Sequence, residues 1–446
     1  FRGEKAYKLR DEVHLEFAMF GTKQELDTVE TRIYGADGRL RWLKLDMPQP
    51  MGQTMQYLGE TVEGKFRVTK KIADEEEVIL IDIPNETLRD ALEAVAMISE
   101  NTKVGDSILS ETYQPFLNER ETLKTKSVVT AVQKTVYNGV LTQVFQVETT
   151  ILSAALTAVA KVTADGETLE QQFGVFTMRL ENEALAKDMQ YVVDMMVWSA
   201  VSTELPITNP RGVTEMTARI EGIADENLIV NDARQSYSVE EHDGEQEELT
   251  AGSESLPPKS YLLTVTTDDL DAIPRATIPM RPEEFGSALK PSSFVQSSNP
   301  EIVRLARSIV GSERNAVGVM KKLTLWVYHN LRKGYTASAS NALDTLARKS
   351  GDCTEHSVLF VALARAAGLP AREVAGVVYS EEGDGFFFHQ WAEAYVGKWV
   401  STDPTFGQPI ADATHIKLTE GEILKQMRIM NAIGRLKIDV VDFEHD

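Results

Sequence analysis

A single cysteine stands where the sequence signals the start of a helix. Cys353 follows Gly351 and Asp352 in the segment SGDCTEH, and Glu355 comes two residues later. Asp352 is a favourable N-cap and Glu355 can complete a capping box, so Cys353 is expected at the first helical position. There the helix dipole favours a thiolate, and unpaired N–H groups can receive an anion. The segment predicts a nucleophile with a lowered thiol pKa, although a lone cysteine can also be a buried structural residue.

A histidine and an aspartate downstream supply the other two groups that a thiol nucleophile needs. His389 lies in FHQWAEAY, where strand alternation places His389 and Trp391 on one face. Asp403 follows fourteen residues later, and a carboxylate there can accept the imidazole N–H and fix its tautomer. Each residue alone has an ordinary explanation, as a strand histidine or a turn before Pro404. Together with Cys353 they predict a catalytic triad.

The turn between the two strands decides whether His389 and Asp403 can meet. A two-residue loop at Gly397-Lys398 would turn Asp403 to the opposite face of the sheet from His389. A three-residue loop, 396–398, would pair Tyr395 with Trp399 and leave Asp403 diagonal to His389, within side-chain reach. The chemistry therefore predicts an odd-length loop, or a bulge before Asp403.

The elements around these residues change from helical to strand periodicity. Apolar residues at spacings of three and four predict helices over 317–331, 341–348 and 352–368. Strands are expected at 371–379, 386–396 and 399–402. Residues 281–446 are thus expected to form an α+β domain. A proline-rich linker, 274–300, leads into it and overlaps its first residues.

The first part of the chain has a different composition and a different pattern. Residues 287–446 carry 18 Lys and Arg against 18 Asp and Glu, so the net charge of −22 lies entirely in the first 286 residues. Asx-Gly pairs at 37–38, 138–139 and 165–166 predict hairpins in an antiparallel β-meander domain over 1–195, with one helix at 88–98. A small β domain is expected at 196–280.

Composition excludes several classes of function. An acidic chain with a pI near 4.9 argues against a nucleic-acid-binding surface, and no apolar run is long enough to span a bilayer. One cysteine excludes an intramolecular disulfide and a cysteine-based zinc site. The acidic loop 240–245 matches no metal-binding pattern, so neither a metal nor a cofactor is expected. The start at Phe1 fits either a removed signal peptide or a trimmed chain.

The segment 317–406 resembles the transglutaminase-like superfamily, whose core is a circularly rearranged papain-like fold. GDC at 351–353, LARAAGLPAR at 363–372, HQWAE at 389–393 and WVSTDPT at 399–405 carry the resemblance. It implies that Cys353 is the nucleophile, His389 the general base and acid, and Asp403 the orienting carboxylate, with Asp352 and Trp391 in support. Tyr335 is the candidate for the oxyanion side chain by its position. His356 is expected on the helix surface.

The expected activity is cysteine-dependent acyl transfer that acts, through a thioester, on a peptide or isopeptide amide of a protein or peptide substrate. Hydrolysis by a protease or amidase is favoured over transglutaminase crosslinking, because water is always available. The alternative is a non-catalytic scaffold or binding protein that retains the core. The acidic β-meander is similar to domains that precede this core in exported bacterial proteins, so a periplasmic or secreted location is expected. No partner of the β domains is predicted.

Overall fold

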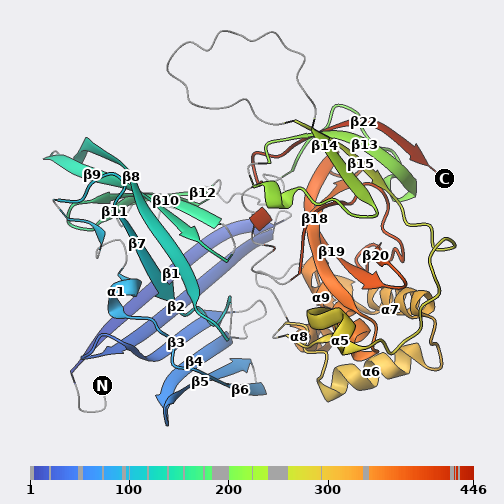
Figure 1. Cartoon of the computed structure of the whole chain (residues 1–446), viewed down its shortest axis with the longest axis horizontal. Coiled ribbons are helices and arrows are strands. Elements are labelled where there is room, and N and C mark those ends of the chain that lie inside the picture. The colour runs from blue at the N-terminus through green and yellow to red at the C-terminus, as the bar shows by residue number, and fades with distance from the viewer. Residues whose placement is uncertain are drawn as a thin grey trace, which may run out of the picture. The chain divides into compact units, whose positions relative to one another are not determined.

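The computed structural model divides the chain into two compact units, Phe1–Asp194 and Met195–Asp446 (Figure 1). It describes residues 5–445 apart from 20–21, 49–53, 73–74, 93–96, 100, 118–119, 138–139, 154–155, 174–175, 183–199, 224, 240–259, 293, 335–340, 422–425, 427 and 430–431. The expected acidic loop at 240–245 lies outside the described residues. No helix in the described ranges is long and apolar enough to cross a membrane.

The first unit contains two six-stranded antiparallel meanders. The first sheet runs in chain order: β1 (Ala6–Met19), β2 (Thr22–Gly35), β3 (Leu40–Pro48), β4 (Thr54–Val62), β5 (Lys65–Ile72) and β6 (Glu75–Ile81). After the short helix α1 (Leu88–Ala91), the second sheet follows: β7 (Ser107–Thr112), β8 (Leu123–Tyr137), β9 (Val140–Ile151), β10 (Leu156–Thr163), β11 (Thr168–Phe173) and β12 (Phe176–Arg179). The expected antiparallel β architecture of this region is therefore present.

Turn chemistry and a buried ion pair shape this unit. Hairpins join β2 to β3 and β10 to β11 at the Asx-Gly pairs 37–38 and 165–166, where Gly38 and Gly166, but not the preceding aspartates, have positive φ angles of 75° and 83°. The third pair, 138–139, lies outside the described residues. Arg32 is bonded to both carboxylate oxygens of the fully buried Glu86 at 2.6 Å. Glu86 also accepts the backbone N–H of Tyr113 at 2.6 Å, so one carboxylate joins the first sheet to the chain after β7. Helix α1 lies within the helix expected at 88–98, of which residues 93–96 fall outside the described residues.

The second unit is built on one antiparallel sheet of four strands in the order β20-β19-β18-β21. These are β18 (Ala371–Ser380), β19 (Gly385–Tyr395), β20 (Trp399–Thr402) and β21 (Ile416–Glu420). Before them come α5 (Pro282–Phe285), α6 (Pro300–Val310), α7 (Ala316–Asn330), β16 (Arg332–Lys333), α8 (Ala342–Arg348), β17 (Ser350–Gly351) and α9 (Cys353–Ala366). One hydrophobic core joins α6, α7 and α9 to Ala392, Ala394 and Val400 of this sheet.

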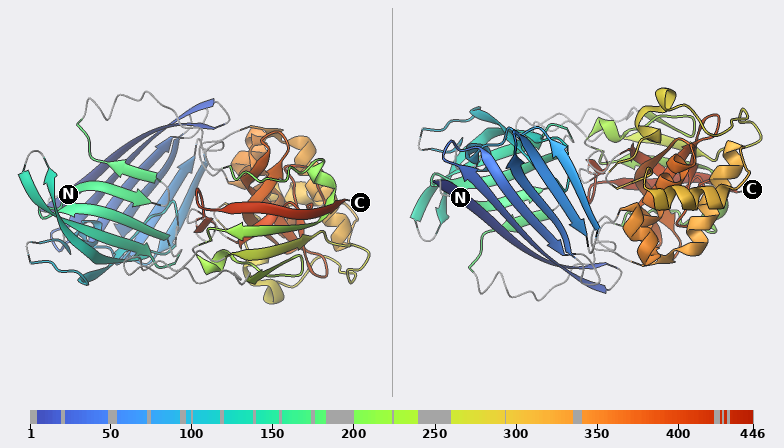
Figure 2. Two further views of the ribbon diagram at one scale, coloured as in Figure 1. Left: turned by 90° about the horizontal axis from the view of Figure 1, so that it is seen from above. Right: turned by 90° about the horizontal axis from the view of Figure 1, so that it is seen from below.

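A second sheet shares a further core with the four-stranded sheet (Figure 2). Its order is β14-β15-β13-β22, from β13 (Val213–Glu221), β14 (Gln235–Val239), β15 (Tyr261–Thr266) and the C-terminal β22 (Lys437–His445). Short 3₁₀ helices in the described part of the unit include η2 (Pro210–Gly212), η3 (Glu226–Leu228) and η4 (Gly286–Leu289). The unit is therefore layered as helices, sheet and sheet.

Two features differ from the expectations. Strand β13 of the expected small β domain, 196–280, is paired with β22 from the chain end, and the core of this sheet includes Val377 and Phe386. Pro300 does not extend a linker, because it occupies the first turn of α6 behind the N-cap Asn299. Proline is well tolerated there since its missing N–H would have no helical partner.

Candidate active site

The N-terminus of α9 holds Cys353 as the sequence predicts. The Asp352 carboxylate accepts the N–H of Thr354 at 2.8 Å, and the Glu355 carboxylate accepts the N–H of Asp352 at 2.8 Å. This is the predicted capping box, and it is confirmed. Cys353 occupies the first position of the helix, where its own N–H has no helical acceptor.

Helix α9 is buried on all sides from Glu355 to Arg365, which makes it the central helix of the unit. The expectation that His356 lies on a helix surface is therefore wrong: its side chain is fully buried, and its Nδ1 lies 2.7 Å from the carbonyl oxygen of Asp352. Ser357 is also fully buried, and its hydroxyl lies 2.7 Å from the carbonyl oxygen of Cys353 and 3.0 Å from that of Gln390. One hydroxyl thus links the first turn of α9, which holds Cys353, to the strand that carries His389.

The hairpin between β19 and β20 has the three-residue loop that the chemistry required. Tyr395 pairs with Trp399, and the ladder continues to Ala392 opposite Thr402. Gly397 in the loop has a φ of 121°, a backbone conformation that favours glycine. The prediction of an odd-length loop is confirmed. Asp403 then follows the last pair of the ladder, on the same face as His389.

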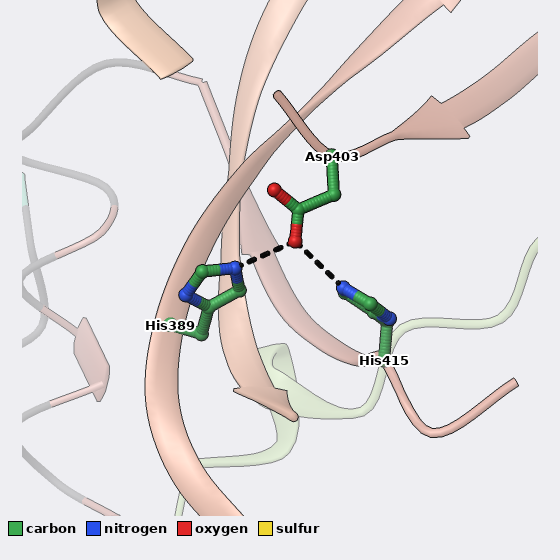
Figure 3. A group of neighbouring side chains, drawn as sticks. All are labelled: His389, Asp403 and His415. Carbon is green, nitrogen blue, oxygen red and sulfur yellow. Dashed lines mark hydrogen bonds and ion pairs between the residues drawn. The ribbon is translucent and has the colours of Figure 1, made fainter. Parts of the chain in front are cut away.

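Asp403 is held by hydrogen bonds on both carboxylate oxygens. His389 Nε2 lies 2.9 Å from Oδ2 (Figure 3). Oδ1 accepts the backbone N–H groups of Thr405 at 2.6 Å and Phe406 at 3.1 Å, a turn that fixes the side chain. Because Nε2 donates to the carboxylate, the lone pair of neutral His389 lies on Nδ1, which points away from Asp403 in Figure 3. The sequence pattern thus brings His389 and Asp403 together.

Aromatic rings enclose the imidazole of His389. Phe406 stacks on it with ring centroids 5.0 Å apart, and the fully buried Trp391 stacks at 6.1 Å. Arg211 lies 4.5 Å from the centroid of the Phe406 ring. Trp391, proposed from the sequence as a supporting residue, is therefore one of the rings that limit the motion of His389.

Burial and neighbouring charges set the protonation states. Burial lowers the pKa of His389 despite the opposing attraction of Asp403, so the ring is neutral at pH 7. His389 and His415 hold the pKa of Asp403 well below its usual range, although burial alone would raise it. The Asp403 side chain is therefore ionised, as an orienting carboxylate must be.

The thiol of Cys353 does not have the lowered pKa that its helix position predicted. Burial raises the pKa of Cys353, and the nearby Asp352 carboxylate raises it further. The backbone N–H of Gln390 hydrogen-bonds the sulfur and acts in the opposite direction, without reversing the result. The prediction was wrong mainly because burial disfavours a thiolate, and also because the capping carboxylates, which create the helix start, repel it. The resting pair is a neutral thiol and a neutral imidazole.

Sequence reasoning missed a second histidine on the same carboxylate. His415 Nε2 lies 3.0 Å from Asp403 Oδ2, and its side chain is fully buried (Figure 3). His415 Nδ1 lies 3.2 Å from the carbonyl oxygen of Asp412. His415 lies just before β21, a strand that neither an alternating apolar pattern nor a turn motif in the sequence had predicted. The one signal in the sequence was the presence of His415 twelve residues after Asp403 and three after Asp412.

Among the described residues, His389, Asp403 and His415 have nitrogen and oxygen atoms within 4.8 Å of one another, a donor set of the kind that divalent cations use. The two hydrogen bonds to Asp403 Oδ2 account for this spacing without an ion. Asp412 then bonds the remaining nitrogen of His415. His389, Asp403 and His415 therefore form a hydrogen-bonded chain.

Tyr335, the predicted oxyanion residue, lies outside the described residues. The described chain just before it, β16, pairs in parallel with β17, so that Lys333 lies opposite Gly351. Gly334 donates its N–H to the carbonyl oxygen of Gly351 at 3.0 Å. Residues 332–334 therefore run beside the segment that leads into Cys353.

Comparison with known protein families matches the part of the chain that holds these side chains. The family model of the transglutaminase-like superfamily matches residues 303–404, a range that contains Cys353, His389 and Asp403. No curated protein matches the chain.

Among solved structures, two neighbours share 20% sequence identity with the chain. The first, from Cytophaga hutchinsonii and provisionally named a cysteine protease, is matched over 52% of this chain and 86% of its own, with a TM-score of 0.32. The second is the periplasmic domain of TgpA from Pseudomonas aeruginosa bound to ethylmercury, matched over 34% of this chain and 57% of its own, with a TM-score of 0.26. By the family match, the chain contains a domain of the transglutaminase-like superfamily at residues 303–404.

Proposed function

We propose that the chain is a cysteine-dependent acyl-transfer enzyme that acts on a peptide or isopeptide amide. One observation carries the proposal: the 2.9 Å bond from His389 Nε2 to Asp403 leaves Nδ1 of His389 as the base. The next residue along the strand, Gln390, donates its backbone N–H to the Cys353 sulfur, so the base and the thiol lie on neighbouring elements. Cys353, His389 and Asp403 would then act as nucleophile, base and orienting group. Asp352 would support Cys353 by starting the helix.

The resting protonation states define the first chemical step. The thiol of Cys353 passes its proton to Nδ1 of His389 while the sulfur attacks the amide carbonyl carbon. The carbonyl electron pair moves to the oxygen, near the N–H of Cys353 at the helix start. When the intermediate collapses, the carbon–nitrogen bond breaks and the leaving amine takes the proton from His389. A thioester and a free amine remain, and Asp403 has stabilised the transient imidazolium.

Water completes the proposed cycle. His389, neutral again, removes a proton from water as its oxygen attacks the thioester carbon. The carbon–sulfur bond breaks, the sulfur regains its proton from His389, and a carboxylic acid is released. An amine in place of water would give a new amide, which is transglutaminase chemistry. We favour hydrolysis because water needs no binding site of its own.

One observation favours the alternative, a scaffold or binding protein that retains the core. Cys353 is half-buried and the pKa of its thiol is raised, as is usual for a structural cysteine. The two readings differ in whether a thioester forms at Cys353.

A mixture of unlabelled peptides tests the function without knowledge of the substrate. The full chain and its Cys353→Ala variant are incubated with the mixture, with and without a primary amine, and products are identified by mass spectrometry. New peptide termini that require Cys353 support hydrolysis, whereas amine-linked products support transamidation. Identical product sets from the two proteins would contradict both enzymatic readings. A location outside the cytoplasm is a further proposal, tested by fractionation of cells that express the complete gene.

A further inference from the structure

His415 completes a chain of charged groups that ends at the proposed base. Arg211 Nη1 in η2 lies 2.8 Å from Asp412 Oδ2, and Asp412 contacts His415 through both its carbonyl oxygen and Oδ1. His415 Nε2 in turn lies 3.0 Å from Asp403 Oδ2. Asp403, Asp412 and His415 are at most 2% exposed. These contacts join the 3₁₀ helix before β13 to the active site.

The hydrogen-bond partners of His415 define its protonation state. Nδ1 faces a carbonyl oxygen and a carboxylate oxygen of Asp412, and both can only accept. Nε2 faces Oδ2 of Asp403, whose pKa is held low, so this oxygen also accepts. A neutral imidazole carries one N–H and would leave a nitrogen lone pair against an acceptor. Only the imidazolium satisfies both sides.

We propose that His415 is a positioning residue, an imidazolium that holds the Asp403 carboxylate in place and limits the basicity of His389. This role rests on the function proposed above. The positive charge on His415 opposes a second positive charge on His389, which keeps the base unprotonated at neutral pH. The bond to Asp403 Oδ2 fixes the oxygen that His389 also uses. The His415 imidazolium thus sets both the position of the His389 ring and its proton affinity.

The charged groups that the structure places around His415 come from several elements, and the two carboxylates among them favour the imidazolium. Asp403 follows β20, Asp412 lies in the loop before β21, and Arg211 reaches Asp412 from η2. The buried Arg234 donates to the carbonyl oxygen of His415 at 2.7 Å. His389 faces the ring at a centroid distance of 5.9 Å. The attraction of Asp412 is the main cause that raises the pKa of His415, against burial, which would lower it.

Nitrogen NMR of the full chain labelled with ¹⁵N-histidine tests the protonation state directly. The signals of His415 are assigned by their loss in the His415→Gln variant. At pH 7.5 both ring nitrogens should resonate as protonated. In Asp412→Asn the imidazolium should titrate at lower pH than in the wild type. A bare nitrogen on wild-type His415, or a His415 signal that moves on addition of EDTA, would overturn the proposal.

The effect on His389 is measured on the same samples. His415→Gln keeps a neutral donor near Asp403 and removes the charge, so the midpoint of the His389 titration should rise by about one pH unit, a tenfold change in proton affinity. His415→Phe removes the donor as well and should also slow acylation of Cys353 on the high-pH plateau. His14→Gln, which removes the exposed histidine bonded to Asp27 in the other unit, is the control and should leave both readouts unchanged.

The titration of His389 and the acylation of Cys353 test the role of His415 and the proposed function separately. An unchanged midpoint for His389 in His415→Gln would overturn the role of His415, whether or not the enzyme is active. An imidazolium and a shifted midpoint, together with no acylation of Cys353 in the wild type, would uphold the electrostatic role and refute the proposed function alone.

Discussion

Tyr395 pairs with Trp399 across the loop that joins β19 to β20. The pairing fixes the face on which the following residues lie, and it turns the side chain of Asp403 toward His389. A shift of one residue would place the carboxylate on the other face of the sheet. The active-site geometry therefore depends on a loop that carries none of the reacting groups.

Substitution of Gly397 by alanine should destabilise the second unit. Gly397 has a φ of 121°, and an added Cβ would lie 2.2 Å from the carbonyl oxygen of Pro274. We expect a loss of roughly 1–3 kcal/mol in the free energy of unfolding, as for other strained backbone positions. Urea unfolding with pulsed thiol labelling measures it, since the one cysteine lies in this unit. Gly311→Ala, at a φ of 61° with no atom near the added Cβ, is the matched control. Equal losses in both variants would contradict the role of the close contact.

The central part of the site was predictable because its constraints are local or pairwise. The capping box around Asp352 follows from residues three apart, and the loop at 396–398 follows from the demand that His389 and Asp403 share a face. His415 was not predictable, because its contact with Asp403 depends on where β21 enters the sheet. The pairing of β13 with β22 is also nonlocal, since it joins residues more than 200 positions apart. The Cys353 pKa was misjudged because burial is a tertiary property.

Asp403→Asn should reduce kcat/KM by about 10³- to 10⁴-fold, in line with loss of an orienting carboxylate in other triads. An amide can present its NH₂ group to Nε2 and so favour the wrong tautomer of His389. Folding is checked by circular dichroism. The control is Asp439→Asn, an exposed aspartate on β22. A variant with more than a tenth of wild-type activity would show that Asp403 is not the orienting group.

Alkylation of Cys353 by iodoacetamide should be slower than that of free cysteine from pH 6 to 8. Burial and the Asp352 carboxylate raise the pKa of the thiol, so the thiolate is scarce below the ordinary thiol pKa of about 8.5 and increases only above it. The measurement is the second-order rate as a function of pH. A rate that is already maximal at pH 6 would indicate a preformed thiolate–imidazolium pair and contradict the neutral resting state.

Limited proteolysis should separate the chain near residue 194 and leave residues 195–446 together. The strands β13 and β15 are paired with each other, and β13 is paired with β22 at the chain end. Cleavage within the proline-rich stretch 274–300 would therefore leave two fragments that stay associated. Mass spectrometry of fragments separated by size under native conditions checks this. A released, folded 301–446 fragment would support three independent domains instead.

Acylation of Cys353 is the central claim, and an activated ester measures it most directly. The full chain is mixed with p-nitrophenyl acetate, quenched with acid and analysed by intact mass and peptide mapping. The account predicts one acetyl group on Cys353, removed by hydroxylamine as a thioester is. It also predicts that acylation slows by at least about 10²-fold in His389→Gln, as expected for loss of a general base. Cys353→Ala should acquire no hydroxylamine-labile group. An unmodified Cys353, or equal rates in the wild type and His389→Gln, would contradict the account.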